Sequence, residues 1–143
     1  MSNSSLASIA VTLADQVAAF LNGQTIGDVT LSAERKLIPI RNLSTVKTLR
    51  AMVVPHSFES KIVARGGLKE RTVRIDVGVM KRASESELDG LLALTQAIGD
   101  KLEGKKFDAG MCVEVAYAPI YNVEVYLEQQ SFFAVIVATM KVL

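Results

Sequence analysis

The sequence contains one histidine, one cysteine and no tryptophan in 143 residues, and this scarcity limits the chemistry open to it. A structural zinc site needs about four nitrogen or sulfur ligands and a catalytic one about three, so His56 and Cys112 cannot form either by themselves. The sequence has no D-x-D-x-D-G loop and no H-E-x-x-H segment, the patterns of dedicated calcium and zinc sites. We therefore expect no bound metal and no cofactor.

A single thiol also excludes a disulfide within the chain, which fits a reducing compartment. Cys112 lies among apolar residues, so we expect it to be a small buried side chain. The N-terminus has neither the positive region nor the apolar stretch of a signal peptide. The longest dense apolar run, 132–137, has the length of a strand and not of a membrane span. These features predict a protein that is made in the cytoplasm and does not enter a membrane.

The chain lacks the motifs of the common nucleophilic enzymes. His56 is the only imidazole, and no G-x-S-x-G turn accompanies it. The segment Arg65-Gly66-Gly67-Leu68-Lys69 resembles a phosphate-binding loop only superficially, because it matches neither G-x-G-x-x-G nor G-x-x-x-x-G-K-S/T. Its two glycines are better explained by hinge freedom or positive φ angles. We expect a protein that is not an enzyme; the alternative is a small hydrolase or transferase with His56 as its base.

Half of the residues are apolar and 22% are charged, a composition typical of a globular protein. A chain of this length buries roughly two-thirds of the surface that it exposes when unfolded. We find no linker and no internal repeat in the sequence. We therefore expect one domain, spanning residues 1–143, around one hydrophobic core.

Two segments show the spacing of an amphipathic helix. The first, 5–21, begins in a serine-rich stretch and ends at Asn22-Gly23, where glycine can adopt the left-handed conformation that closes a helix. The second, 85–102, begins with Ser84 and Glu87, which are spaced as a capping box, and ends at Gly104. The positions expected to face the core are Leu6, Ile9, Ala10, Leu13, Val17, Phe20 and Leu21 in the first helix, and Leu88, Leu91, Leu92, Thr95, Ile98 and Leu102 in the second.

Alternating polarity and short apolar runs predict five extended segments. They are 27–39, 48–55, 71–80, 111–117 and 131–142. We expect Pro55 to end the second of them and a polar loop, 56–70, to follow it. We further expect a turn at Ala118-Pro119, and we assign no element to the half-polar stretch 123–128.

The last strand is apolar on both faces as far as Ala138, so it belongs either in the middle of a sheet or at a subunit interface. Each helix has one apolar stripe and must bury it against a face of the sheet. The sequence therefore predicts an α+β fold, a single two-layer domain in which a mostly antiparallel β-sheet packs against two main α-helices.

Charge is distributed unevenly along the chain, although the formal net charge is only +1. From Arg35 to Arg74, ten lysines and arginines face two acidic residues, whereas residues 81–143 hold six basic and nine acidic residues. This pattern is compatible with a nucleic-acid-binding patch. It is equally compatible with a heterologous contact between copies, which closes into a ring, and with an ordinary solvated surface.

Three segments carry a resemblance to a known family. They are L-S-T-V-K-T-L-R-A-M-V-V-P (43–55), T-V-R-I-D-V-G-V (72–79) and Y-L-E-Q-Q-S-F-F-A-V-I-V (126–137). The first ends in V-V-P, and the last places a polar segment before an F-x-A/S-x-I/V/L strand. With the two helices and the overall length, this pattern resembles the tail-terminator, or tail-completion, proteins of long-tailed bacteriophages, which include minor tail protein U-like and neck proteins.

The resemblance implies a structural virion protein that forms a homohexameric ring on the last ring of the tail tube. Such a ring ends tube polymerisation and presents a joining surface to a head-side connector or neck protein. Genome DNA would pass through the ring without sequence-specific binding. The protein would then reside in the virion tail, at its head-proximal neck. Another phage head-tail connector or neck protein, or a small nucleic-acid-binding module, is the alternative.

Two segments are candidate interfaces. In the predicted loop 56–70, we expect Arg65, Lys69 and Arg71 to make charged contacts with the tail tube or a neighbouring subunit. Gly66 and Gly67 would serve as a hinge. The second candidate is the final strand, where the interface residues would be Phe132 and Phe133.

Overall fold

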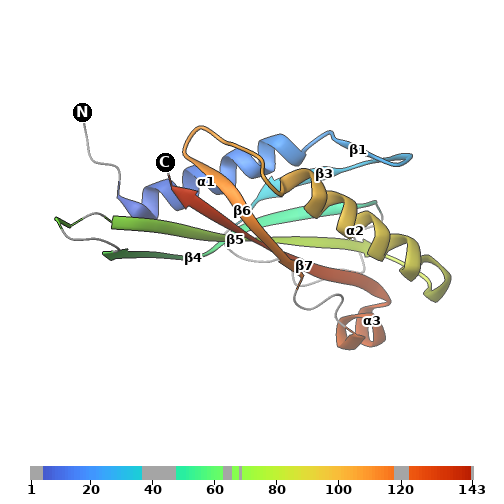
Figure 1. The fold of residues 1–143 in the computed structure, drawn as a ribbon. Coiled ribbons are helices and arrows are strands. Elements are labelled where there is room, and N and C mark those ends of the chain that lie inside the picture. Colours follow the sequence, from blue (N-terminus) through green and yellow to red (C-terminus); the bar gives the residue numbers. More distant parts are fainter. Residues whose placement is uncertain (1–4, 37–47, 63–65, 68, 118–122, 143) are drawn as a thin grey trace.

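The computed structural model describes residues 5–36, 48–62, 66–67, 69–117 and 123–142, and these residues form a β-sheet with helices packed on it (Figure 1). The main sheet has five strands in the order β3-β4-β5-β7-β6. Its strands are β3 (Ser32–Arg35), β4 (Arg50–Ile62), β5 (Lys69–Arg82), β7 (Ser131–Val142) and β6 (Gly110–Tyr117). β3 is parallel to β4, and every other neighbouring pair in this sheet is antiparallel. A separate short hairpin consists of β1 (Thr25–Ile26) and β2 (Val29–Thr30).

Two helices, α1 (Leu6–Leu21) and α2 (Leu88–Leu102), cover one face of the main sheet (Figure 1). α1 contacts β3, β4 and β5, whereas α2 contacts β6 and β7. The predicted α+β class, with a mostly antiparallel sheet against two main helices, is confirmed. A third helix, α3 (Val123–Gln129), contacts β7 near its start. It occupies the stretch 123–128, to which the sequence assigned no element.

Both predicted helix starts and ends agree with the structure. Ser5 caps α1, where its hydroxyl accepts a hydrogen bond from the Ser8 amide at 3.1 Å. After α1, Gly23 has a φ of +84°. At the start of α2, the Glu87 carboxylate accepts a hydrogen bond from the Ser84 amide at 3.1 Å, which is one half of the predicted capping box. The first turn there is a short 3₁₀ segment, Glu85–Glu87, that leads into the α-helix.

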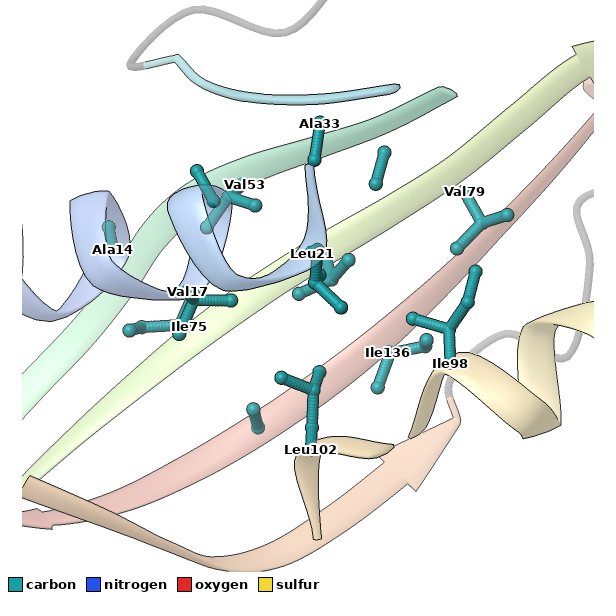
Figure 2. Packing of buried hydrophobic residues seen from close by; sticks show 14 of the residues in the cluster. Ala14, Val17, Leu21, Ala33, Val53, Ile75, Val79, Ile98, Leu102 and Ile136 are labelled. Carbon is teal, nitrogen blue, oxygen red and sulfur yellow. The ribbon is translucent and has the colours of Figure 1, made fainter. Parts of the chain in front are cut away.

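The core lies between this helix layer and the sheet (Figure 2). It contains fully buried side chains from both helices and from three central strands. The figure labels Val17 and Leu21 of α1, Ile98 and Leu102 of α2, and Ile75 and Ile136 of the strands beneath them. Cys112, on β6, is also fully buried, as predicted. Burial raises the pKa of its thiol above the ordinary value of 9.0.

The final strand β7 lies inside the sheet, with β5 on one side and β6 on the other. Its apolar pattern predicted either the middle of a sheet or a subunit interface, and in the structure it lies in the middle of the sheet. Alternate side chains from Phe132 to Met140 face the helices and are buried, whereas Phe133, Val135 and Val137 on the opposite face are partly exposed.

The predicted end of a strand at Pro55 is wrong, because β4 continues through the proline to Ile62. The pairing with β5 shifts register between Pro55 and Ser57. Proline is tolerated there because β3 pairs with β4 only from Arg50 to Val53, so Pro55 lies where one side of β4 has no strand among the described residues. The predicted loop 56–70 is therefore largely wrong as well, since 56–62 and 69–70 belong to β4 and β5.

The predicted extended segment 27–39 is divided into β2 and β3, with Leu31 fully buried between them. Pro39 and the expected turn at Ala118-Pro119 lie outside the described residues.

Two glycines test the packing of the fold in opposite ways. A β-carbon on Gly110 would lie 2.8 Å from the Lys141 carbonyl oxygen of the neighbouring strand, so Gly110→Ala must displace backbone. We expect it to lower the free energy of unfolding by about 1–3 kcal/mol. Gly90, inside α2, has nothing within 4 Å of such a carbon, and Gly90→Ala should raise stability by about 0.5–1 kcal/mol. Urea denaturation of both variants measures the difference; equal effects would contradict it.

Glu87 should make stability depend on acid pH. Hydrogen bonds from Lys81 and Ser84 lower the pKa of its carboxyl from 4.5 to about 2. Because the folded pKa is the lower one, the stabilisation is present above the unfolded pKa and is lost as the pH falls from about 5 to about 2. Glu87→Gln should flatten the pH profile of the unfolding free energy in this range. Glu85→Gln, a neighbouring exposed change, is the control, and an identical profile for both variants would exclude the role given to Glu87.

Candidate assembly surface

The paired strands β4 and β5 form an arm that extends past their neighbours in the sheet. We define the hairpin arm as residues 55–62 of β4 with residues 69–75 of β5, of which 72–75 also pair with β7. β3 stops opposite Val53, and β7 reaches only Thr72. Beside the arm's β4 edge the described residues place no further strand. Figure 1 shows the arm projecting toward and past the N-terminal end of α1.

The tip of the arm contains two of the residues singled out in the sequence. Gly66 and Gly67 are exposed and have φ angles of +87° and +79°. A β-carbon would meet nothing within 4 Å at either position, so the requirement for glycine comes from the backbone angle. Positive φ was one of the two explanations given for this glycine pair. Arg65 lies outside the described residues.

One face of the arm combines positive charge with apolar side chains. Lys69 pairs with Ile62 and Arg71 with Ser60 across the hairpin. Because side chains on a strand alternate, Lys69 and Arg71 point to the same side of the arm as Phe58 and Ile62. Phe58 is 51% exposed and Ile62 is 67% exposed. Glu70 points to the other side and forms an ion pair with Lys141, N to O 3.8 Å.

A groove of about 220 Å³ lies where the arm meets α1. One wall is the first half of α1 and the other is β4 around its register shift; the lining residues are Ala7, Ala10, Val11, Pro55, His56, Ser57 and Phe58. Of the described residues that line it, most are apolar and one, His56, is titratable. The groove can therefore accept an apolar side chain from outside.

His56 is exposed, and it belongs to a strand and not to the predicted loop 56–70. Its Nδ1 lies 2.7 Å from Oδ2 of Asp76, on β5. The other carboxylate oxygen of Asp76 is buried and has no hydrogen-bond partner. The sequence did not predict this pair, because it depends on the continuation of β4 past Pro55. Among the described residues, no group of three or more histidine, cysteine, aspartate and glutamate side chains could hold a metal ion.

The two candidate phenylalanines of β7 occupy different environments. Phe132 is completely buried among the core residues under the helices. Phe133 is partly buried on the opposite face, packed with Met52, Val54 and Met80. Their adjacent positions place them on opposite faces of the strand. An interface role stays a prediction for both, and of the two only Phe133 has exposed surface for a contact.

The strand β6 forms the other edge of the sheet, and sequence reasoning did not select it. Its first residues are covered by the preceding segment, because the Cys112 amide donates to the Lys105 carbonyl at 2.9 Å. Beyond a register shift between Cys112 and Glu114, the described residues show no backbone partner on its outer side. Met111 is 37% exposed and Val113 is 46% exposed.

A second cavity, of about 260 Å³, lies between α2 and the end of β6. Tyr117 lines it and donates a hydrogen bond from its hydroxyl to the Gln96 carbonyl at 3.4 Å. A β-carbon on Gly99 would overlap this hydroxyl, so glycine is what lets the tyrosine lie against α2. The remaining lining is Leu92, Ala93 and Thr95. None of the described lining residues is charged, so this part of the cavity has the chemistry of a packing gap.

No family model and no curated protein matches this sequence. Among solved structures, the chain is similar to one described as "Virion of native gene transfer agent (GTA) particle". That match has a TM-score of 0.55 and 12% sequence identity, and it covers 94% of this chain and 97% of the other. The two chains therefore share a fold over nearly their whole lengths. In the described part of the chain, no helix is long and apolar enough to span a membrane.

Proposed function

We propose that this chain is a structural protein of a phage-like virion and that it acts as the tail terminator. The observation that carries the proposal is the shared fold with a chain of a gene transfer agent virion, which extends over 94% of this chain. The family resemblance of residues 43–55, 72–79 and 126–137 supports the same assignment. A non-enzymatic role agrees with the surface, where the prominent features are an arm and two apolar strand edges.

In this proposal six copies form a ring on the last ring of the tail tube, at the head-proximal neck of the virion. The ring stops further addition of tube protein and offers its other face to a head-side connector or neck protein. DNA passes through the centre without sequence-specific contacts. The sheet and its two helices supply the rigid body that such a ring subunit needs, because the core is continuous from α1 through the sheet to α2.

The hairpin arm is the proposed contact with the tail tube. It projects from the body (Figure 1) and places Lys69 and Arg71 beside Phe58 and Ile62 on one face. An apolar contact gains most of its energy from buried area, and the surrounding cations add orientation. Arg65 and the glycine pair at the tip belong to the same proposed contact. Phe133, on the helix-free face, is a further candidate contact.

Another head-tail connector or neck protein is the second candidate, because such a ring would have the same need for a projecting arm and a rigid body. The two roles differ in partner. A terminator binds the end of the tail tube, whereas a connector binds the head-side portal assembly and leaves tube length unchanged.

Shortening the arm tests the terminator role. Replacing residues 62–69 with Asn-Gly leaves the pair Lys61 and Glu70 joined by a two-residue turn that suits a hairpin. We expect a folded protein that no longer caps tubes, so that purified tail tube protein polymerises to uncontrolled lengths in electron micrographs. The unshortened chain should give tubes with a hexameric ring at one end.

The matched control keeps the arm at full length and removes only two of its positive charges. Lys69→Gln with Arg71→Gln should weaken capping without abolishing it, and the unshortened chain should lose capping as salt is added. Normal capping by the shortened protein, with unchanged thermal unfolding, would overturn the role of the arm. Tight binding to duplex DNA that falls steeply with salt would favour the nucleic-acid-binding alternative.

A further inference from the structure

The main sheet has two partly open edges. On one side, β4 loses its neighbour beyond Val53; on the other, β6 has no strand outside it among the described residues. An open edge presents unpaired amides and carbonyls and invites another strand. Residues 55–62 of β4 and 113–117 of β6 are therefore two strand-sized segments with backbone groups available for pairing.

Exposed apolar side chains gather on these two strands. Among the large apolar residues that the described part of the chain leaves exposed, Phe58 and Ile62 lie on β4, and Met111 and Val113 lie on β6. The remaining one, Leu127 on α3, is apart from both edges. Natural edge strands are commonly protected by lysine or proline, but residues 113–117 contain neither. Residues 55–62 do contain Pro55 and Lys61, so the absence of such protection marks the β6 edge as the one that requires a partner. On the β4 edge the exposed Phe58 and Ile62 offer apolar surface for that partner.

The directions of the strands determine how the β4 edge of one copy can pair with the β6 edge of another. β4 is antiparallel to β5, β5 to β7, and β7 to β6, so β4 and β6 run in opposite directions. Two copies placed side by side in the same orientation bring β6 of one next to β4 of the other as an antiparallel pair. Such a contact is heterologous, because each copy uses one surface to bind and a different one to be bound, and it closes into a ring when the rotation allows.

Charge and shape also support pairing of the β4 edge with the β6 edge. The arm carries Lys61, Lys69 and Arg71, and none of these has an ion pair among the described residues. Glu114 lies on β6. Burial raises the pKa of the nearby Tyr117, and the carboxylates of Asp100 and Glu103 raise it further. The groove between α1 and β4 offers room for an apolar side chain from the incoming strand. Strand addition with a neighbouring side-chain pocket is a recurrent mode of recognition.

We propose that the edge of β4 at residues 55–62 binds the edge of β6 at residues 113–117 of a second copy of this chain; neither edge has an outer strand among the described residues. The proposal deepens the ring proposed above and rests on that function for the identity of the partner. It makes the sheets of neighbouring subunits continuous, and it assigns the β4 edge to the neighbour within the ring.

Single changes on each edge test this pairing. Phe58→Asp places a charge on the β4 edge, and Val113→Lys places one on the β6 edge; both side chains are about half exposed, 51% and 46%, so folding should tolerate the changes. Each variant alone should associate at least about tenfold more weakly than the unsubstituted chain and behave as a monomer in sedimentation velocity. Leu127→Lys, at a residue that is 73% exposed, is the control and should form rings normally.

Mixing the two variants gives the sharper result. Phe58→Asp retains an intact β6 edge and Val113→Lys an intact β4 edge, so an equal mixture should restore association, because each mixed pair has one contact between two unsubstituted edges. Rings from either variant alone would overturn the proposal, as would a stable dimer of one variant, which would indicate an isologous contact. On ring formation by the unsubstituted chain, amide exchange should slow at 55–62 and 113–117 and not in α3.

The outcome separates this pairing from the proposed function. If the unsubstituted chain caps tail tubes but both edge variants also assemble, the pairing is wrong and the terminator role stands. If rings form through these edges yet never bind tubes, the pairing stands and the terminator role is wrong.

Discussion

The structure depends on the position of β7 inside the sheet. Its two neighbours, β5 and β6, pair along most of its length, and its helix-side residues, among them Phe132 and Ile136, are fully buried. Because β7 takes the inner place, β6 becomes an edge strand although it comes earlier in the chain. α2 then lies over β6 and β7, while α1 lies over β3, β4 and β5. The two helices thus share one face. β3 and β6 are the edge strands of the sheet, and among the described residues β4 has no outer neighbour beyond Val53.

Most of this framework could be predicted from local patterns. Helix spacing, the Ser5 cap and the Ser84-Glu87 pair act within a few residues, so the sequence specifies them directly. The apolar faces of β7 predicted either the middle of a sheet or a subunit interface, and the sheet order shows the first. Two features could not be found in this way. Whether a proline ends a strand depends on whether a neighbouring strand needs the amide hydrogen that proline lacks. At Pro55 this is decided by the short length of β3, which does not reach the proline. α3 is only seven residues long, too short to show a clear helical period in the sequence. It also contains two valines, a residue type of low helix propensity.

The candidate assembly surface was predicted in part. Uneven charge pointed to the middle of the chain, and Lys69 and Arg71 do lie on the projecting arm. They share a face with Phe58 and Ile62 because of the strand register. A segment that is predicted as a loop has no register, so the sequence could not show this shared face. The two phenylalanines of β7 show a second limit of prediction from the sequence. When both faces of a strand are apolar, alternation separates Phe132 from Phe133 but does not tell which faces the helices. The β6 edge was missed because an edge is a property of the sheet order and not of the strand's own sequence.

A single arm can serve two neighbours because its surfaces point in different directions. The backbone edge of β4 lies in the plane of the sheet, so the proposed partner there continues the sheet around the ring. The tip, with Gly66 and Gly67 at positive φ, extends along the strands and beyond the body, which suits a contact with the ring below. The two contacts support each other: adding a strand to β4 would stiffen the arm on its open side. A ring would therefore hold its arms in order for the tube, and an isolated copy would pay that ordering entropy only when it docks.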